Sequence, residues 1–267
     1  MALEKLKNRY NKMRKAYCSE TSFLNSVNKY KDDMKNFNVW WLGQSGFLIQ
    51  WQGKHLLMDP YLSDSLTKKY AKTDKPHKRI TERVVNPLKM DFINVVTASH
   101  GHTDHLDPET LLPLVKSNNN MDLIVPAAEI ELAVDRSSLS EDKIKSINAG
   151  EVIESNGFKI HAIPSAHEKI KMDNNGNHYY LGYIVEFGPW TIYHSGDTVE
   201  YDKMENYLTR WNLDIVFLPI NGRKKEIRIP GNMWGDESAS LAKRVNAKAV
   251  IPHHFNMFKF NTESPND

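Results

Sequence analysis

Short apolar runs broken by glycine, proline or polar turns dominate the chain from Val39 onward, and they predict strands. The first three runs, VWWLG, GFLIQW and KHLLMDP, are separated by Gly43 and Gly46 and by the Gln52-Gly53 pair, a pattern typical of a strand meander. Further runs of this kind are INVVTAS, DLIVP, EVIES, FKIHAIP, YLGYIVEF, WTIYH and AKAVIP.

Helical spacing of apolar positions occurs between these runs and before them. Residues 3–35 have this spacing and predict a helical extension that packs by one face. Asp107-Pro108-Glu109 predicts a helix start, and residues 127–135, 202–210 and 236–246 predict helices. Residues 63–90 lose periodicity and predict a long loop with one helical turn, and loops of this length in a compact domain are often functional. Strands interrupted by surface helices indicate an α/β layered domain.

Composition places the chain among ordinary globular proteins. It has 267 residues, of which 40% are hydrophobic and 25% charged, which excludes disordered, collagen-like and coiled-coil classes. The net charge of +2 argues against a dedicated nucleic-acid or anionic-membrane binder. The single Cys18 excludes an intramolecular disulfide and a cysteine-rich metal site, and it favours a reducing compartment.

Targeting signals are not evident in the sequence. The first twenty residues are charged throughout and do not have the apolar segment of a signal peptide. No later window approaches the eighteen apolar residues of a membrane span. We therefore expect a cytoplasmic protein with no membrane and no nucleic-acid partner, while the formation of a homo-oligomer stays open.

Four potential metal ligands lie within six residues, in SHGHTDHLD, where a predicted strand runs into a predicted helix. His100 and His102 occupy alternate positions and can point the same way, and the following turn can bring Asp104 and His105 to the same pocket. Imidazole and carboxylate ligands suit Zn, Mn or Fe. Four such groups are too many for one open catalytic ion, so the loop predicts the start of a two-metal site.

Further ligands are available at other predicted strand ends. His167 follows FKIHAIP, Asp197 follows WTIYH, and His253 or His254 follows AKAVIP. A single residue of this kind is more often a hydrogen-bonded structural residue than a ligand. Together with the histidine-rich loop, these residues predict a metal site assembled from several strand ends.

SHGHTDHLD, the downstream SAHE and HSGDT, and the terminal IPHH resemble the ordered motifs of the metallo-β-lactamase superfamily. The fold of that superfamily is an αββα sandwich of two mixed β-sheets flanked by helices, with a binuclear site along one edge. The resemblance runs from about residue 38 to the C-terminus, so we expect an extension over residues 1–37 and a hydrolase domain over residues 38–267. VWWLGQSGFLIQ, LLMDPYLS, YHSGDT and NAKAVIPHH resemble the branch that contains L-ascorbate-6-phosphate lactonase.

The resemblance also implies which residues hold the metals, two divalent ions that are either Zn²⁺ or Mn²⁺. It assigns His100, His102 and His167 to one ion, Asp104, His105 and His254 to the other, and Asp197 as the bridge. His254 is favoured over His253 because the branch reads P-x-H at this point. Asp104 would also orient the attacking hydroxide and shuttle its proton.

Three further positions qualify the resemblance. The matching Asp of the superfamily supports the first metal loop, which gives Asp59 a supporting role, although a turn-forming Asp-Pro is the equal alternative. Gln44 stands where many relatives have His, which leaves it a supporting or substrate-facing role. The lactonase carries a carboxylate at the position of His167, so zinc is as open as manganese.

The segment PINGRKKEIRIPGNMWGDE combines glycines with basic residues after a buried strand. Arg228 first, and Arg223 second, are candidates for binding a substrate phosphate or carboxylate, and a solvated basic loop is the alternative. The leading hypothesis is therefore a binuclear hydrolase that acts on a small anionic molecule such as a sugar-acid lactone phosphate. The alternative is a phosphodiesterase acting on a nucleotide or phospholipid. A di-iron oxidoreductase is disfavoured because no fused flavin domain is present.

Overall fold

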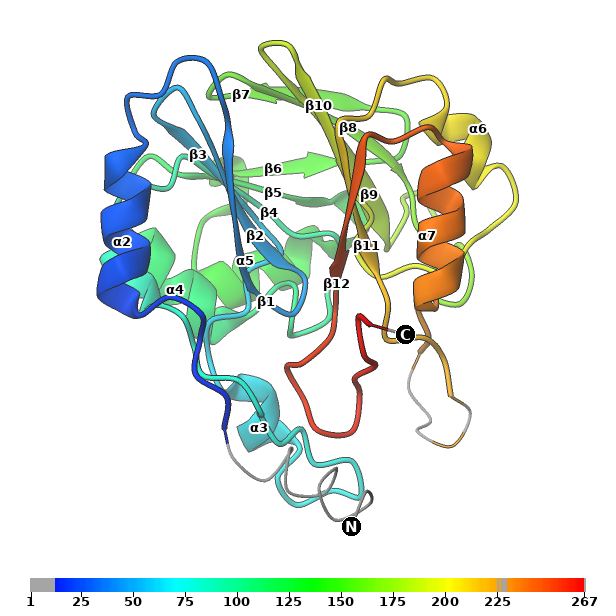
Figure 1. Cartoon of the computed structure of the whole chain (residues 1–267), viewed down its shortest axis with the longest axis horizontal. Helices are drawn as coiled ribbons and strands as arrows, with labels where there is room; N and C mark the ends of the chain where they lie inside the picture. Colours follow the sequence, from blue (N-terminus) through cyan, green and yellow to red (C-terminus); the bar gives the residue numbers. More distant parts are fainter. Residues whose placement is uncertain (1–12, 225, 227–229, 267) are drawn as a thin grey trace.

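Two six-stranded sheets pack face to face in the computed structural model, which describes residues 13–224, 226 and 230–266 (Figure 1). The first sheet has the order β1 to β6, with bounds Asn38–Gly43, Gly46–Trp51, Lys54–Met58, Val95–Thr97, Asp122–Pro126 and Ile144–Ile147. The second has the order β12-β11-β10-β9-β8-β7; in chain order, β7 to β12, its strands are Val152–Ser155, Phe158–Pro164, Leu181–Phe187, Trp190–His194, Ile215–Pro219 and Ala249–His253.

Both sheets are mixed. In the first, β1, β2 and β3 pair antiparallel, and β3 to β6 pair parallel. In the second, β7 to β10 pair antiparallel, and β10, β11 and β12 pair parallel. Because β8 and β10 are each antiparallel to β9, they run in the same direction and end at the same edge of the sheet.

Helices cover the outer faces of both sheets (Figure 1). The helices α2 (Glu20–Lys29), α4 (Pro108–Ser117) and α5 (Ile130–Ser137) lie over the first sheet, and α6 (Met204–Leu208) and α7 (Gly235–Arg244) lie over the second. The αββα sandwich with two mixed sheets is therefore confirmed. Among the described residues, no helix combines the length and the hydrophobicity needed to cross a membrane.

Three of the four buried hydrophobic clusters in the described residues follow this architecture. Between the sheets pack Phe47, Ile49, Tyr183, Val185 and Phe217, all fully buried. A second cluster lies under α2, α4 and α5, and a third lies under α6 and α7. These five helices therefore each bury one face against a sheet, as the helical spacing predicts.

Some elements differ from the sequence-based expectation. Residues 127–135 divide into a 3₁₀ turn η2 (Ala127–Glu129) and α5. Residues 63–90 contain the expected helical turn as α3 (Ser65–Lys69), and in addition a 3₁₀ turn, Pro87–Lys89. The strand β6 was not predicted. Its sequence IKSI offers only two apolar residues, and it pairs with β5 alone at the edge of the sheet.

The N-terminal segment is described from residue 13. Its helix α2 begins after Ser19, whose side chain accepts a hydrogen bond from the Ser22 amide. Phe23 and Val27 are buried against the first sheet, and the Trp40 indole donates a hydrogen bond to Ser26 Oγ at 2.8 Å. The first twelve residues of the expected extension lie outside the described residues, and its separation from a domain over residues 38–267 stays a prediction.

We expect Phe47→Ala to lower the free energy of unfolding by about 3–5 kcal/mol, measured by urea denaturation. The Phe47 ring lies 4.4 Å from that of Phe217, and it also meets the rings of His194 and His253 at 5.9 and 6.1 Å. Removing it opens a cavity directly beneath the edge where the candidate site lies.

Leu112→Ala is the control for this measurement. The Leu112 side chain is 45% exposed on α4, so its truncation should change the free energy of unfolding by no more than about 0.5 kcal/mol. Equal losses in the two variants would contradict the inter-sheet layer as the main source of stability.

Candidate metal centre

A tight turn after β4 holds four of the candidate ligands. The backbone amides of His105 and Leu106 both donate to the carbonyl of His102, at 3.0 and 2.9 Å, which closes the turn before α4 begins at Pro108. The ring centroids of His100 and His102 lie 4.6 Å apart, and those of His100 and His105 lie 4.0 Å apart. The turn therefore gathers the side chains of the loop on one side.

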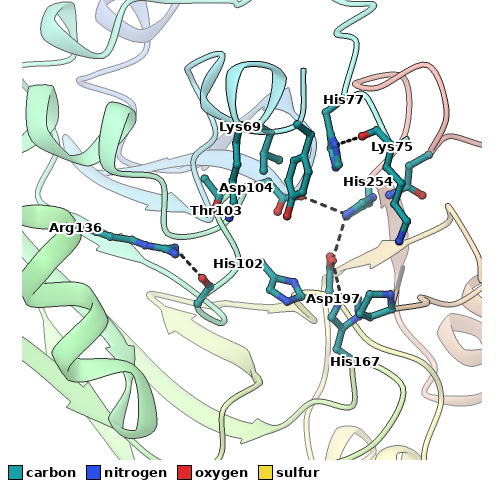
Figure 2. Close-up of a pocket in the computed structure, with 15 residues that line it drawn as sticks. Lys69, Lys75, His77, His102, Thr103, Asp104, Arg136, His167, Asp197 and His254 are labelled. Carbon is teal, nitrogen blue, oxygen red and sulfur yellow. Dashed lines mark hydrogen bonds and ion pairs between the residues drawn. The ribbon is translucent and has the colours of Figure 1, made fainter. Parts of the chain in front are cut away.

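The other candidates come from the ends of strands at the same edge. His167 follows β8, Asp197 follows β10, and His254 directly follows β12. Figure 2 shows Asp197 and His254 facing Asp104 across the pocket, with His102 and His167 beside them. The structure thus brings all seven sequence-predicted ligands together, in three groups whose ligand atoms lie within 4.8 Å of one another: His100, His102 and His167; His100, His105 and Asp197; and Asp104, His105 and His254.

Asp197 lies between these groups. Its Oδ1 is 3.3 Å from His105 Nε2, and its Oδ2 is 3.2 Å from His254 Nε2 and 3.8 Å from His167 Nε2. One carboxylate therefore faces ligands from both halves of the cluster, which is the position required of a bridging residue.

Several polar atoms of the cluster are buried without a hydrogen bond. His100 Nε2, His105 Nε2 and Asp197 Oδ1 make no hydrogen bond, although each atom is removed from water and the last two face each other at 3.3 Å. An unsatisfied buried donor or acceptor destabilises a fold, so such atoms are rare. All three atoms belong to one group of potential ligands. A bound cation would satisfy them together, so the residues present fit a metal ion.

The second ring nitrogens of three histidines are engaged by the protein. His105 Nδ1 lies 2.6 Å from Asp59 Oδ2, His100 Nδ1 lies 3.0 Å from Ser99 Oγ, and His167 Nδ1 donates to the Gly231 carbonyl at 3.1 Å. Contacts of this kind fix the orientation of a metal-binding imidazole and leave Nε2 for the ion.

Asp59 is tied into the backbone of the ligand loop. Its Oδ1 accepts a hydrogen bond from the Ser99 amide at 2.7 Å, and its Oδ2 accepts from Ser99 Oγ as well as facing His105. The carboxylate is fully buried. Its contacts go to the strand end and to a ligand, in the position that the sequence analysis proposed for a supporting residue.

Electrostatics divides the cluster into two halves. Burial lowers the pKa of His167 to about 4, and it also lowers the pKa values of His100 and His102. These three imidazoles are therefore neutral near pH 7, the form in which histidine binds a metal.

The carboxylate-rich half behaves in the opposite way. Burial alone would lower the pKa of His254, but Asp197 and Asp104 outweigh it and raise the pKa to about 9. Burial would likewise raise the pKa values of Asp104 and Asp197, but the facing histidines hold both below their ordinary value. The two carboxylates stay ionised and attract positive charge, whether it is carried by imidazolium or by a metal ion.

Gln44 and His254 meet at the edge of the cavity. Gln44 Nε2 donates to Asp104 Oδ2 at 2.8 Å and lies 2.9 Å from His254 Nε2, while the His254 amide donates to the Gln44 carbonyl at 2.9 Å. Gln44 therefore supports the carboxylate-rich half. His253 points elsewhere, because its Nδ1 lies 3.1 Å from Ser45 Oγ and its ring stacks on that of His194.

Of the two arginines predicted to bind the substrate, the structure describes only one. Arg228 lies outside the described residues. Arg223 forms a two-point ion pair with Glu237, with both nitrogen–oxygen distances at 2.6 Å, and its Nη1 also donates to the Asn232 carbonyl. Its guanidinium is thereby held by α7, and its role in substrate binding stays a prediction.

Sequence reasoning missed several residues around the site. A cavity of about 380 Å³ opens onto Asp104, Asp197 and His254, and its wall includes Lys69, Tyr70, Lys75, His77 and Arg136. Four of these five belong to residues 63–90, which were expected to be functional but had no motif to mark single residues. Tyr180 was also missed, and its ring packs against those of His100 and His167 at 5.2 and 5.6 Å.

Comparison with known proteins decides the family. A model described as the beta-lactamase superfamily domain matches residues 38–254, most of the chain. The chain belongs to the metallo-β-lactamase superfamily.

Named relatives within the superfamily agree with this assignment. The chain is similar to a metal-dependent hydrolase of Caldivirga maquilingensis, with 25% identity over 85% of this chain and 86% of the relative. It is similar to another metal-dependent hydrolase, from Thermoplasma acidophilum, with 28% identity over 87% and 89%. The crystal structure of a possible metal-dependent hydrolase from Veillonella parvula shares the fold, with a TM-score of 0.68, 17% identity and coverage of 86% and 88%. Together with the ligand cluster, these findings support a metal-dependent hydrolase.

We expect Asp59→Asn to weaken Zn²⁺ binding by roughly 10–100-fold, because an amide cannot accept all the hydrogen bonds that the carboxylate accepts. Asp59 has a φ of 43°, a conformation that Asn adopts readily, so the backbone should not be disturbed. A competition titration with a chromogenic chelator measures the affinity. Asp202→Asn, at an exposed position, is the matched control, and equal affinities in the two variants would refute the supporting role of Asp59.

Proposed function

We propose that this metallo-β-lactamase-fold chain is a binuclear hydrolase that acts on a small anionic molecule, with a sugar-acid lactone phosphate as the first candidate. The observation that supports two ions is the position of Asp197 between two groups of ligands. His100, His102 and His167 would hold one ion, and Asp104, His105 and His254 the other. Divalent zinc or manganese at these positions would acidify water and polarise a carbonyl or phosphoryl oxygen of the substrate.

Asp104 is the residue proposed to handle the proton. Its Oδ2 faces Gln44, His105 and His254, while its side chain is 14% exposed and lines the cavity. The low pKa, maintained by His105 and His254 against the effect of burial, keeps it a carboxylate at neutral pH. A carboxylate that is fixed through one oxygen and reaches the cavity can orient an attacking water and accept its proton.

The wall of the cavity supports an anionic substrate. Lys69, Lys75 and Arg136 line it, and among the described lining residues the only acidic ones are Asp104 and Asp197, both proposed ligands. Cationic side chains bind phosphate or carboxylate through charge-assisted hydrogen bonds. A volume of about 380 Å³ suits a small molecule rather than a polymer. The cytoplasmic location and the formation of a homo-oligomer stay predictions.

We expect protein that is stripped of metal and reloaded with Zn²⁺ or Mn²⁺ to hydrolyse L-ascorbate 6-phosphate. Asp104→Ala should lower the turnover number by about 10²–10⁴-fold, because it removes both a ligand and the proton acceptor. His102→Ala should lower the turnover number as well, because it removes a ligand. Asp202→Ala, at an exposed position, is the matched control.

Each outcome of this assay has a defined meaning. Undiminished turnover in Asp104→Ala or His102→Ala would refute the binuclear mechanism. Absence of turnover in protein with both ions shown to be bound would remove the lactonase substrate. Bis(p-nitrophenyl) phosphate is the second probe, and its cleavage would indicate a phosphodiesterase.

We expect Lys69→Ala and Lys75→Ala each to raise the Michaelis constant for a phosphorylated substrate by roughly 10-fold or more, since a hydrogen bond to a charged group contributes about 1.5–3 kcal/mol. A neutral ester should be affected much less. Lys72→Ala is the control, because Lys72 is exposed on the same segment and is not among the residues that line the cavity. Equal effects on charged and neutral substrates would remove the anion-binding role of this segment.

A further inference from the structure

The segment formed by η2 and α5 lies against the ligand loop. Glu129 and Arg136 are seven residues apart, which corresponds to two helical turns and places them on one face. Ala133, between them on the same face, is fully buried. This face therefore packs into the protein, with a carboxylate at one end and a guanidinium at the other.

Arg136 joins the two ends of the ligand loop. Its Nη1 donates to the Gly101 carbonyl at 2.7 Å, the dashed contact of Arg136 in Figure 2. The same nitrogen donates to the Leu106 carbonyl at 3.0 Å. These two carbonyls enclose the stretch that carries His102, Asp104 and His105. One guanidinium nitrogen, carried by α5, thus links the two ends of the loop.

Glu129 holds the same loop at Gly101. Its carboxylate lies against the Gly101 backbone and attracts the charge of Arg136. A Cβ atom at residue 101 would lie 2.6 Å from Glu129 Oε2 and 2.7 Å from Oε1. Gly101 is not among the residues with positive φ, so the backbone itself would accept a side chain. The obstacle to a side chain here is the Glu129 carboxylate.

We infer that Glu129 and Arg136 are positioning residues that hold residues 101–106 in the conformation that presents the metal ligands. The inference rests on the metal site of the proposed function, but not on the reaction or the substrate. A loop that is ordered before the ion arrives loses less conformational entropy on binding, so its affinity is higher. Neither residue belongs to the motifs that mark the ligands.

Arg136→Gln tests the clamp formed by Glu129 and Arg136 through metal binding in the full-length protein. We expect the Zn²⁺ dissociation constant to rise by roughly 10–100-fold, as for other residues that orient metal ligands without binding the metal themselves. The visible absorption spectrum of the Co²⁺-loaded protein should also change, because it reports ligand geometry. Arg244→Gln is the control, since its ion pairs with Glu200 and Glu205 lie on the surface away from the loop.

The contact between Gly101 and Glu129 provides a second test that does not depend on removing the arginine. Gly101→Ala should weaken Zn²⁺ binding by roughly 10-fold or more, because the new methyl group collides with the carboxylate. Combining it with Glu129→Ala should recover part of that loss, since the collision is gone. Additive losses in the double variant would contradict the contact as the reason for a glycine at this position.

The outcomes separate the clamp from the metal site itself. If the wild-type protein binds neither Zn²⁺ nor Co²⁺, the proposed metal site and the clamp are both wrong. If the wild-type protein binds Zn²⁺ and Arg136→Gln binds it equally with an unchanged Co²⁺ spectrum, only the clamp is wrong. Unfolding of the metal-free variants is measured in parallel, and if Arg136→Gln does not fold, the Gly101 and Glu129 variants decide.

Discussion

The attraction between two buried carboxylates and the histidines around them is the interaction on which the rest of the site depends. Asp104 and Asp197 are ionised in spite of burial because His105 and His254 face them, and the pKa of His254 rises to about 9 in return. Without such compensation the cluster would be strongly destabilising. Three buried atoms, His100 Nε2, His105 Nε2 and Asp197 Oδ1, still make no hydrogen bond. The protein groups alone therefore do not satisfy all the polar atoms of the cluster.

The mixed topology of the sandwich makes this cluster possible to build. The parallel pairing of β3 with β4, and of β10, β11 and β12, sends several strand ends to one edge, and β8 reaches the same edge because it runs parallel to β10. The turn after β4 contributes four candidate ligands, and the ends of β8, β10 and β12 contribute one each. The rigid sheets therefore fix distances between residues that are far apart in the sequence, which a single loop could not do.

The sequence allowed the fold and the ligand cluster to be predicted because both leave a local signal. Apolar runs ending in His or Asp mark the strand ends, and His100 to His105 form a dense motif. The choice between His253 and His254 had no local signal and came from the resemblance. In the structure His254 has a φ of 61° and its side chain lies in the ligand cluster, while the ring of His253 stacks on that of His194.

Other features could not be predicted for a physical reason. The strand β6 has too few apolar residues to show alternation, and its partner is known only once the sheet exists. Lys75 and His77 lie on an irregular segment, where no periodicity tells which side chains face the cavity. Arg223 has the residue type expected of an anion-binding group, but its pairing with Glu237 depends on the position of α7.

The two sides of the cavity differ in structure: regular elements surround the ligands, and a largely irregular segment forms the opposite wall. The ligand side is surrounded by strand ends, by Asp59 and by α5, so its geometry has little freedom. The opposite wall of the cavity comes from residues 63–90, where Lys69 ends α3 and Lys75 and His77 belong to no helix or strand. Changes in that wall would alter charge and shape without disturbing the ligands. Substrate preference can therefore differ between proteins that share this fold and these ligands, which explains why the ligand motifs identify the family more readily than the substrate.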